Sequence, residues 1–420
     1  MMRVALTGAT GLLGRNLLFE IVKRNLHALD RLQVVVLGRR WRGQRLKDRV
    51  RDILLTDGSQ YIGLSEESGT ILREFCEGNV HCIEMDLELD GLCLDDGALH
   101  ALQSEAVDFL FHCAAMANLR DTPAVRWALE NTNVRGTERL LNLAATLQLR
   151  EFCYVGSAYS CGVASGVIRP DYADLTQEFR NPYERTKLEA EAFVRQFEQT
   201  TGIRCRYFRP SVICGRLIEP PLGSISKFDV LYGWGAFFLQ LKAEALKPGQ
   251  DLYATPCTLP IRLAVNPRGG LNIVPVDFVA KAIWEVCANQ AHQRSYHIAN
   301  SEETPHTHYG SLILETLNID GCEFVEGIPA DPNSLEKLYY KTVGRIFTPY
   351  VQSAPMIFDT SSTDSILERT GLRCPPVNAA NLRILIDYAK ERDFGVDLKG
   401  RGGRAGTGRL RPGMRLQKAG

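Results

Sequence analysis

The first residues of the chain join a short apolar strand to a glycine-rich turn and a long amphipathic helix, in the run VALTGATGLLGRNLL from Val4. Gly8, Gly11 and Gly14 allow a tight turn and let backbone N–H groups approach a pyrophosphate, which then lies at the positive end of the helix. A turn without a ligand would use the same glycines, but the strand before them and the helix after them favour a dinucleotide site. We expect this site to be lined by Gly8, Thr10, Gly11, Leu12, Leu13 and Gly14.

Short β-branched runs alternate with helical patterns through the first half of the chain. This alternation predicts an α/β, Rossmann-type doubly wound parallel sheet. The expected strands are RVALTG, QVVVLG, VHCIEMD, VDFLFHCAA, FCYVGS and RCRYFRPSVI. We predict a Rossmann domain over residues 1–215, completed by about 271–300, and a smaller C-terminal α+β substrate lobe over 216–270 and 301–396. Residues 397–420 are basic and glycine-rich, which is typical of a disordered tail.

The end of the second expected strand discriminates between the two nicotinamide dinucleotides. An NAD site commonly places a carboxylate there for the ribose 2′-hydroxyl, whereas an NADP site places an arginine there for the 2′-phosphate. The strand ends in Gly38, Arg39 and Arg40, with no carboxylate before Asp48. A guanidinium can bind the phosphate through two parallel hydrogen bonds. The sequence therefore predicts NADPH, with Asp86 at the end of the third strand near the adenine.

A tyrosine and a lysine stand four residues apart in NPYERTKLEAE, on an expected helix. Tyr183 and Lys187 could form an ordinary surface pair at this spacing. Alternatively, the Lys187 ammonium lowers the pKa of the Tyr183 phenol, from about 10 for a free phenol, so that Tyr183 can act as a general acid near neutral pH.

Several motifs follow one another in an order that resembles the extended short-chain dehydrogenases/reductases. They are TGATGLLG, FHCAA, NVRGT at Asn133, YVGSAYSCG around Ser157 and YERTK from Tyr183 to Lys187. The pieces LGRRWRGQRLKDRV, RPSVICGR and LNIVPVDFVAKAI further resemble the male-sterility or thioester-reductase branch, which includes fatty acyl-CoA reductases. The chain has Ser157 where that branch often has threonine, and it lacks adenylation and carrier domains.

The resemblance implies a catalytic set of Tyr183, Lys187 and Ser157. Tyr183 would protonate the carbonyl oxygen, Ser157 would donate a hydrogen bond to it, and Lys187 would support the phenol and bind the nicotinamide ribose. Asn133 would fix the local geometry rather than contact the substrate. The remaining implied cofactor contacts are Asp86, Leu87, Ala114, Ala115, Asn133, Tyr183, Lys187, Pro210 and Val212.

The function implied by this resemblance is NADPH-dependent reduction of an acyl thioester to an aldehyde, or to an alcohol if a second hydride follows. The thioester would arrive on coenzyme A or on an acyl-carrier protein, and a homodimer is compatible with the branch. An alternative keeps the fold and triad in an NADP-dependent ketone or hydroxyl oxidoreductase, or in a nucleotide-sugar epimerase or dehydratase. A third hypothesis is a non-catalytic NADP-binding regulator, which the intact triad disfavours.

Composition narrows the partners and the compartment. The chain has 49 basic and 49 acidic residues, so a nucleic-acid partner is not expected. Its 12 cysteines never form C-x-x-C, which favours reduced thiols over disulfides or a metal site. The most apolar run, Val230 to Leu241, is too short to span a bilayer and fits a buried helix or a lid. With no secretory signal before the first strand, these features predict a cytoplasmic protein without a transmembrane segment.

Overall fold

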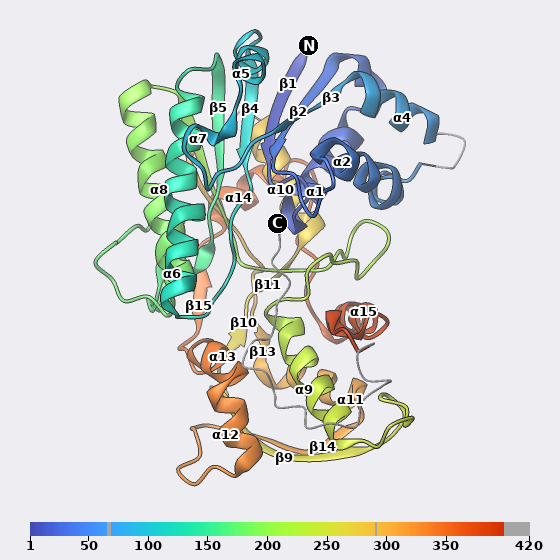
Figure 1. Cartoon of the computed structure of the whole chain (residues 1–420). Coiled ribbons are helices and arrows are strands. Elements are labelled where there is room, and N and C mark those ends of the chain that lie inside the picture. The colour runs from blue at the N-terminus through green and yellow to red at the C-terminus, as the bar shows by residue number, and fades with distance from the viewer. Residues whose placement is uncertain (65–68, 290–291, 399–420) are drawn as a thin grey trace.

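A computed structural model describes residues 1–64, 69–289 and 292–398. Within them, parallel strands form one large sheet in the order β12-β7-β5-β4-β1-β2-β3 (Figure 1). The strands are β1 (Met2–Thr7), β2 (Leu32–Gly38), β3 (Val80–Glu84), β4 (Val107–His112), β5 (Leu149–Val155), β7 (Arg204–Pro210) and β12 (Ser295–Ile298). The order reverses between β1 and β4, so the crevice for a ligand is expected at the carboxyl ends of these two strands. The Rossmann-type fold prediction is confirmed.

Helices cover both faces of the sheet because its strands alternate their apolar side chains between the faces. Val4, Leu6 and Val34 face one core, with helices α1 (Leu12–Arg24), α2 (Leu46–Ile53), α3 (Ser59–Ile62), α4 (Gly69–Gly78), α10 (Val276–Ala288) and α14 (Ser361–Leu367). Ala5 and Val35 face the other core, with α5 (Asp96–Gln103), α7 (Gly136–Ala144) and α8 (Pro182–Thr201). Strands buried on both faces are typical of parallel sheets.

Two elements depart from their expected form. The run expected as one strand over 204–213 ends at Pro210, and the chain continues as β8 (Val212–Cys214), which pairs with β11 (Ile273–Pro275) in a separate ladder. The helical segment from Thr122 starts as α6 (Pro123–Leu129) and widens to a π-helical stretch, η4 (Glu130–Arg135), before α7. Such π-helical stretches are frequent at functional sites.

A third apolar core lies among the C-terminal elements, drawn below the sheet in Figure 1. It holds α9 (Leu231–Ala245), α11 (His306–Thr316), α12 (Ser334–Lys341), α13 (Val343–Val351) and α15 (Ala379–Lys390). The strand pairs around it are β9 (Cys257–Ala264) with β14 (Ile319–Val325), β10 (Gly270–Leu271) with β13 (Thr304–Pro305), and β6 (Gly166–Ile168) with β15 (Met356–Phe358). The apolar run from Val230 is therefore largely the buried helix α9.

The exact domain boundaries remain a prediction, although α14 lies against α10 and β12 rather than in the C-terminal core. Residues 399–420 of the predicted tail lie outside the described residues. Among the described helices, none has both the length and the apolar character that a membrane span requires.

Candidate active site

The glycine turn packs directly against the end of β4. Gly8 has φ +74°, and a Cβ on it would lie 2.7 Å from the Ala114 nitrogen. A Cβ on Gly14 would overlap the Gly8 carbonyl. Helix α1 begins at Leu12 after an N-cap glycine that has no side chain to satisfy the first N–H groups. The turn thus leaves a cradle that a larger side chain would fill, with free helix N–H groups directed at it.

Predicted contacts from four strands converge on one edge because these strands are parallel. Gly8 follows β1, Ala114 and Ala115 follow β4, Ser157 follows β5, and Pro210 ends β7. Val212 lies just beyond, in β8. On the far side, Asp86 and the buried Leu87 follow β3. The Asp86 Oδ1 atom accepts a hydrogen bond from the Glu88 N–H at 3.0 Å.

The cofactor arginines differ in their partners. Arg39 lies 3.4 Å from Glu88 and 4.0 Å from Asp86, and the more exposed Arg40 pairs with Glu84 at 3.3 Å. Both predicted arginines therefore already have carboxylate partners.

Arg49, on α2, was missed by the sequence reasoning. Its Nη2 donates to Thr10 Oγ1 at 3.0 Å and its Nη1 donates to the Arg39 carbonyl at 3.1 Å. Burial and the neighbouring Arg39 charge lower the pKa of Arg49, and no carboxylate among the described residues pairs with it. The signal lay in the run RRWRGQRLKDR, whose last arginine returns to the glycine turn only once α2 has formed.

The lysine of the predicted triad is buried between α8 and β5. Lys187 Nζ donates to the Val155 carbonyl at 2.6 Å and lies 4.6 Å from the centre of the Tyr154 ring. The Tyr154 hydroxyl donates in return to the Lys187 carbonyl at 3.0 Å. Burial lowers the pKa of Lys187 to about 8, so the ammonium form still dominates at neutral pH.

The two hydroxyls of the triad lie at the start of α8 and directly after β5. The Ser157 Oγ accepts a hydrogen bond from the Tyr159 N–H at 3.2 Å, which leaves its own O–H free to donate. Tyr183 is half-buried in the first turn of α8, and its hydroxyl forms no hydrogen bond within the described chain. Both hydroxyls are therefore able to donate to a carbonyl oxygen.

The pKa of Tyr183 differs from the prediction. Burial first, and then the charges of Glu184 and Asp229, raise the pKa of Tyr183 to about 12. The expected lowering by Lys187 is wrong for the protein alone, because desolvation outweighs the ammonium. Tyr183 consequently keeps its proton at neutral pH, as a general acid requires.

Asn133 and His112 hold the scaffold around the triad. Asn133 lies in η4, where its Oδ1 accepts from the Met116 N–H at 2.8 Å and its Nδ2 donates to Thr186 Oγ1 at 3.2 Å. This arrangement supports the predicted geometric role for Asn133. His112 lies between Thr7 and Thr137, and burial lowers its pKa to about 3, so it stays neutral.

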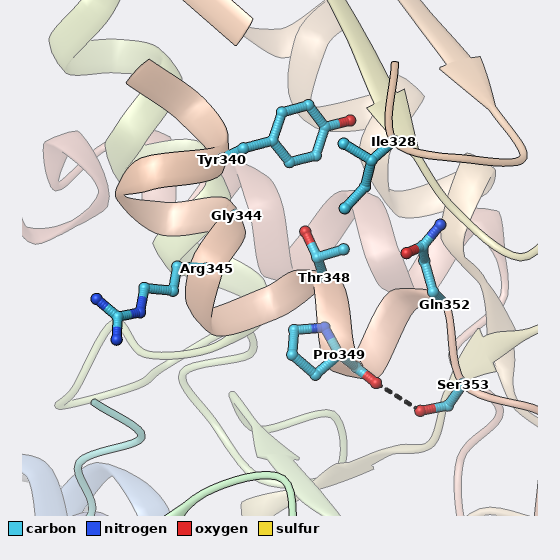
Figure 2. Close-up of a pocket in the computed structure, with 8 residues that line it drawn as sticks. All are labelled: Ile328, Tyr340, Gly344, Arg345, Thr348, Pro349, Gln352 and Ser353. Atoms are coloured by element: carbon cyan, nitrogen blue, oxygen red, sulfur yellow. Dashed lines mark hydrogen bonds between the residues drawn. The ribbon is translucent and has the colours of Figure 1, made fainter. Parts of the chain in front are cut away.

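A surface pocket of about 400 Å³ lies along α12 and α13, away from the triad (Figure 2). It is lined by Ile328, Tyr340, Gly344, Arg345, Thr348, Pro349, Gln352 and Ser353, none of which is a predicted site residue. Separately, Glu151, Cys153 and Cys287 place three potential metal ligands within 4.8 Å of one another. Glu151 already pairs with Arg206 and Arg204, so this cluster is explained by ion pairing.

Comparison with known proteins decides the family. The family described as "Male sterility protein" matches residues 6–283, which include the glycine turn and the triad. The chain belongs to this family. Its membership confirms the predicted extended short-chain dehydrogenase/reductase branch, a group of NAD(P)-dependent oxidoreductases.

The chain is similar to fatty acyl-CoA reductase 1 of Pongo abelii, with 26% identity over 75% of this chain and 61% of that protein. It is also similar to a linear gramicidin synthase of Brevibacillus parabrevis, with 23% identity over 72% of this chain and 6% of that protein. The chain therefore spans less than two thirds of either curated relative.

Solved structures with the same fold cover nearly the whole chain. The terminal R domain from the myxalamid PKS-NRPS biosynthetic pathway has a TM-score of 0.68 and 20% identity, covering 94% of this chain and 92% of that one. DesIV, a dTDP-glucose 4,6-dehydratase from Streptomyces venezuelae, has a TM-score of 0.60 and 18% identity, covering 93% and 97%. At these identities, the structures show a shared fold alone.

Proposed function

We propose that this chain reduces an acyl thioester with NADPH. The main support is that Tyr183, Lys187 and Ser157 lie at the same sheet edge as the glycine cradle, in a member of the male sterility family. The chain resembles both a fatty acyl-CoA reductase and the R domain of a PKS-NRPS pathway, which supports a thioester on coenzyme A or on a carrier protein.

The chemistry assigned to this chain is proton delivery and stabilisation of the oxyanion. The bound nicotinamide supplies the hydride to the thioester carbonyl carbon. Ser157 donates a hydrogen bond to the carbonyl oxygen, and Tyr183 protonates that oxygen as negative charge develops. The resulting hemithioacetal loses its thiol when the C–S bond breaks, which leaves an aldehyde. A second reduction with the same residues would yield the alcohol.

NADPH rather than NADH is proposed because Arg49 brings a cation without a carboxylate partner to the glycine turn, beside Arg39. We expect Arg49→Gln to raise the Kd for NADPH about tenfold or more, because a charge-assisted hydrogen bond to the 2′-phosphate is lost. The Kd for NADH should change less than about twofold. Fluorescence titration of the two cofactors measures this.

The matched control for Arg49 is Arg45→Gln, which alters an exposed arginine paired with Asp48 at 2.9 Å. This control should leave both affinities unchanged. Equal losses for NADPH and NADH in Arg49→Gln would contradict a phosphate contact.

The defining experiment measures NADPH loss and free thiol together, with a panel of acyl-CoA thioesters. Coupled loss of NADPH and release of thiol supports the proposal, and one or two NADPH per thiol identifies the aldehyde or the alcohol as product. NADPH loss without thiol, with ketones or aldehydes only, supports the alternative carbonyl oxidoreductase. Binding of NADPH without turnover of any substrate, including acyl-carrier thioesters, supports the non-catalytic hypothesis.

An epimerase or dehydratase shares the fold, as DesIV illustrates. NAD-bound epimerases would be expected to carry an acidic residue after the second strand, where this chain has Arg39. A cytoplasmic location also belongs to the proposal, and it is supported by all 12 cysteines being free. Light scattering of the purified chain tests the homodimer.

A further inference from the structure

Helix α13 reaches from the C-terminal core to the first turn of α8, where Tyr183 lies. Its Tyr350 hydroxyl donates to Glu184 Oε1 at 2.7 Å and accepts from Asn181 Nδ2. Asn181 is the N-cap of α8 and accepts from the Glu184 N–H at 3.1 Å. The residue directly after the general acid is thus bonded both to its own helix cap and to a tyrosine 166 positions further along the chain.

Glu184 is a fully buried carboxylate. Its Oε2 accepts from the Arg180 N–H at 3.0 Å, and the Arg180 guanidinium, also buried, lies 3.5 Å from its Oε1. A buried charge of this kind is retained only where partners hold it firmly, and loss of one partner is costly. Glu184 therefore has one fixed position, set partly by Tyr350.

Tyr350 also contacts the segment that carries the other hydroxyl. Its ring lies 5.7 Å from the ring of Tyr159 in an edge-to-face arrangement. The Tyr159 N–H is the donor to Ser157 Oγ. Arg180, whose guanidinium lies 5.3 Å from the Tyr350 ring centre, donates to Ser353 Oγ at 3.2 Å at the end of α13. One side chain of α13 thus adjoins both catalytic hydroxyl segments.

We propose that Glu184 and Tyr350 are positioning residues that register the Tyr183 and Ser157 hydroxyls against each other and tie both to helix α13. This inference rests on the proposed function, because it assigns these residues to the same proton delivery. A helix cap alone would need only Asn181 and Glu184. The additional bond from Tyr350, and its contact with Tyr159, connect the cap to the second catalytic segment.

Glu184 also acts on the Tyr183 phenol through its charge. The ionisable groups that face this phenol are Glu184 and Lys187 from α8, Asp229 from the segment before α9, and Tyr154 from β5. Glu184 and Asp229 raise the pKa of Tyr183. Neutralising Glu184 therefore lowers that pKa and increases the tyrosinate fraction at any given alkaline pH.

The first test compares Tyr350→Phe with wild type. We expect kcat with an acyl-CoA thioester, and with an aliphatic aldehyde, to fall about tenfold, because the Glu184 carboxylate loses a strong hydrogen bond. The Kd for NADPH should stay within about twofold, since Tyr350 makes no contact with the glycine turn. Glu189→Gln is the matched control: Glu189 lies on the same helix and pairs with Arg185, away from α13.

The second test needs no turnover. In protein labelled at tyrosine Cζ with ¹³C, the Tyr183 resonance is assigned by its loss in Tyr183→Phe and followed against pH. We expect Glu184→Gln to raise the tyrosinate fraction at pH 10.5 at least about threefold, whereas Glu189→Gln leaves it unchanged. Glutamine can still accept from Tyr350, so this variant removes the charge while keeping the contact.

The two readouts separate this inference from the proposed function. An unchanged kcat in Tyr350→Phe, or an unchanged Tyr183 titration in Glu184→Gln, overturns the positioning pair while thioester reduction by the wild type stands. If the wild type releases no thiol but reduces the aldehyde, the proposed function fails and both readouts still decide the pair. If the wild type turns over nothing, the titration alone decides it.

Discussion

Replacing Tyr183 with phenylalanine is expected to lower kcat for thioester reduction by about 10²- to 10⁴-fold, the usual contribution of a positioned general acid or base. The phenylalanine ring fills the same half-buried space, and the missing hydroxyl has no hydrogen bond within the described chain, so the fold should be preserved. Ser157 would still donate a hydrogen bond to the carbonyl oxygen, which leaves a residual rate. Steady-state NADPH consumption with an acyl-CoA measures the loss.

The control is Tyr172→Phe, which removes a hydroxyl from a partly buried tyrosine at the edge of the C-terminal core. This variant should keep wild-type kcat and KM. A Tyr183→Phe protein that retained more than a tenth of wild-type kcat would show that another group delivers the proton, and the assigned role would be wrong.

The second large effect concerns stability. Asp277 is fully buried at the start of α10, and its carboxylate accepts backbone hydrogen bonds from Leu217, Ile218 and Glu219 at 2.7–3.3 Å, and from Phe278 at 3.0 Å. Asp277→Ala leaves these donors without their acceptor. We expect the free energy of unfolding to fall by about 3 kcal/mol, because a buried unsatisfied donor costs about 1–3 kcal/mol and several are affected. Urea denaturation measures this difference.

Asp251→Ala is the matched comparison, because Asp251 also accepts two backbone N–H groups at 2.7 Å, from Tyr253 and Ala254, but at an exposed position. Water replaces the lost carboxylate there, so the free energy of unfolding should change by less than about 1 kcal/mol. Equal losses in the two variants would mean that the burial of Asp277 adds nothing to the strength of its bonds.

Local signals in the sequence were sufficient for the parallel sheet and for the placement of the triad. The glycine turn, Ser157 and Tyr183 each sit at a strand end or helix start that short motifs identify, and parallel strands then bring those ends to one edge. The π-helical stretch that holds Asn133 has no such signal, because its residues fit an ordinary helix as well.

Features that depend on folding back or on burial could not be predicted in the same way. Arg49 reaches Thr10 only because α2 returns to the glycine turn. The direction of the Tyr183 pKa shift depends on desolvation, which a motif does not report. In the C-terminal elements, β14 pairs with β9 across more than fifty residues. Long-range pairing of this kind leaves no periodic pattern in either partner.

The pairing of β15 with β6 joins residues 356–358 to residues 166–168, and α14 then packs against α10 before α15 returns to the C-terminal core. The polypeptide therefore passes back and forth between the two bodies instead of crossing once. A contiguous fragment that ends near residue 300 would lack the partner strand of β6 and the helix that covers β12. Cooperative unfolding of both bodies together follows from this threading, and neither is expected to survive as an excised piece.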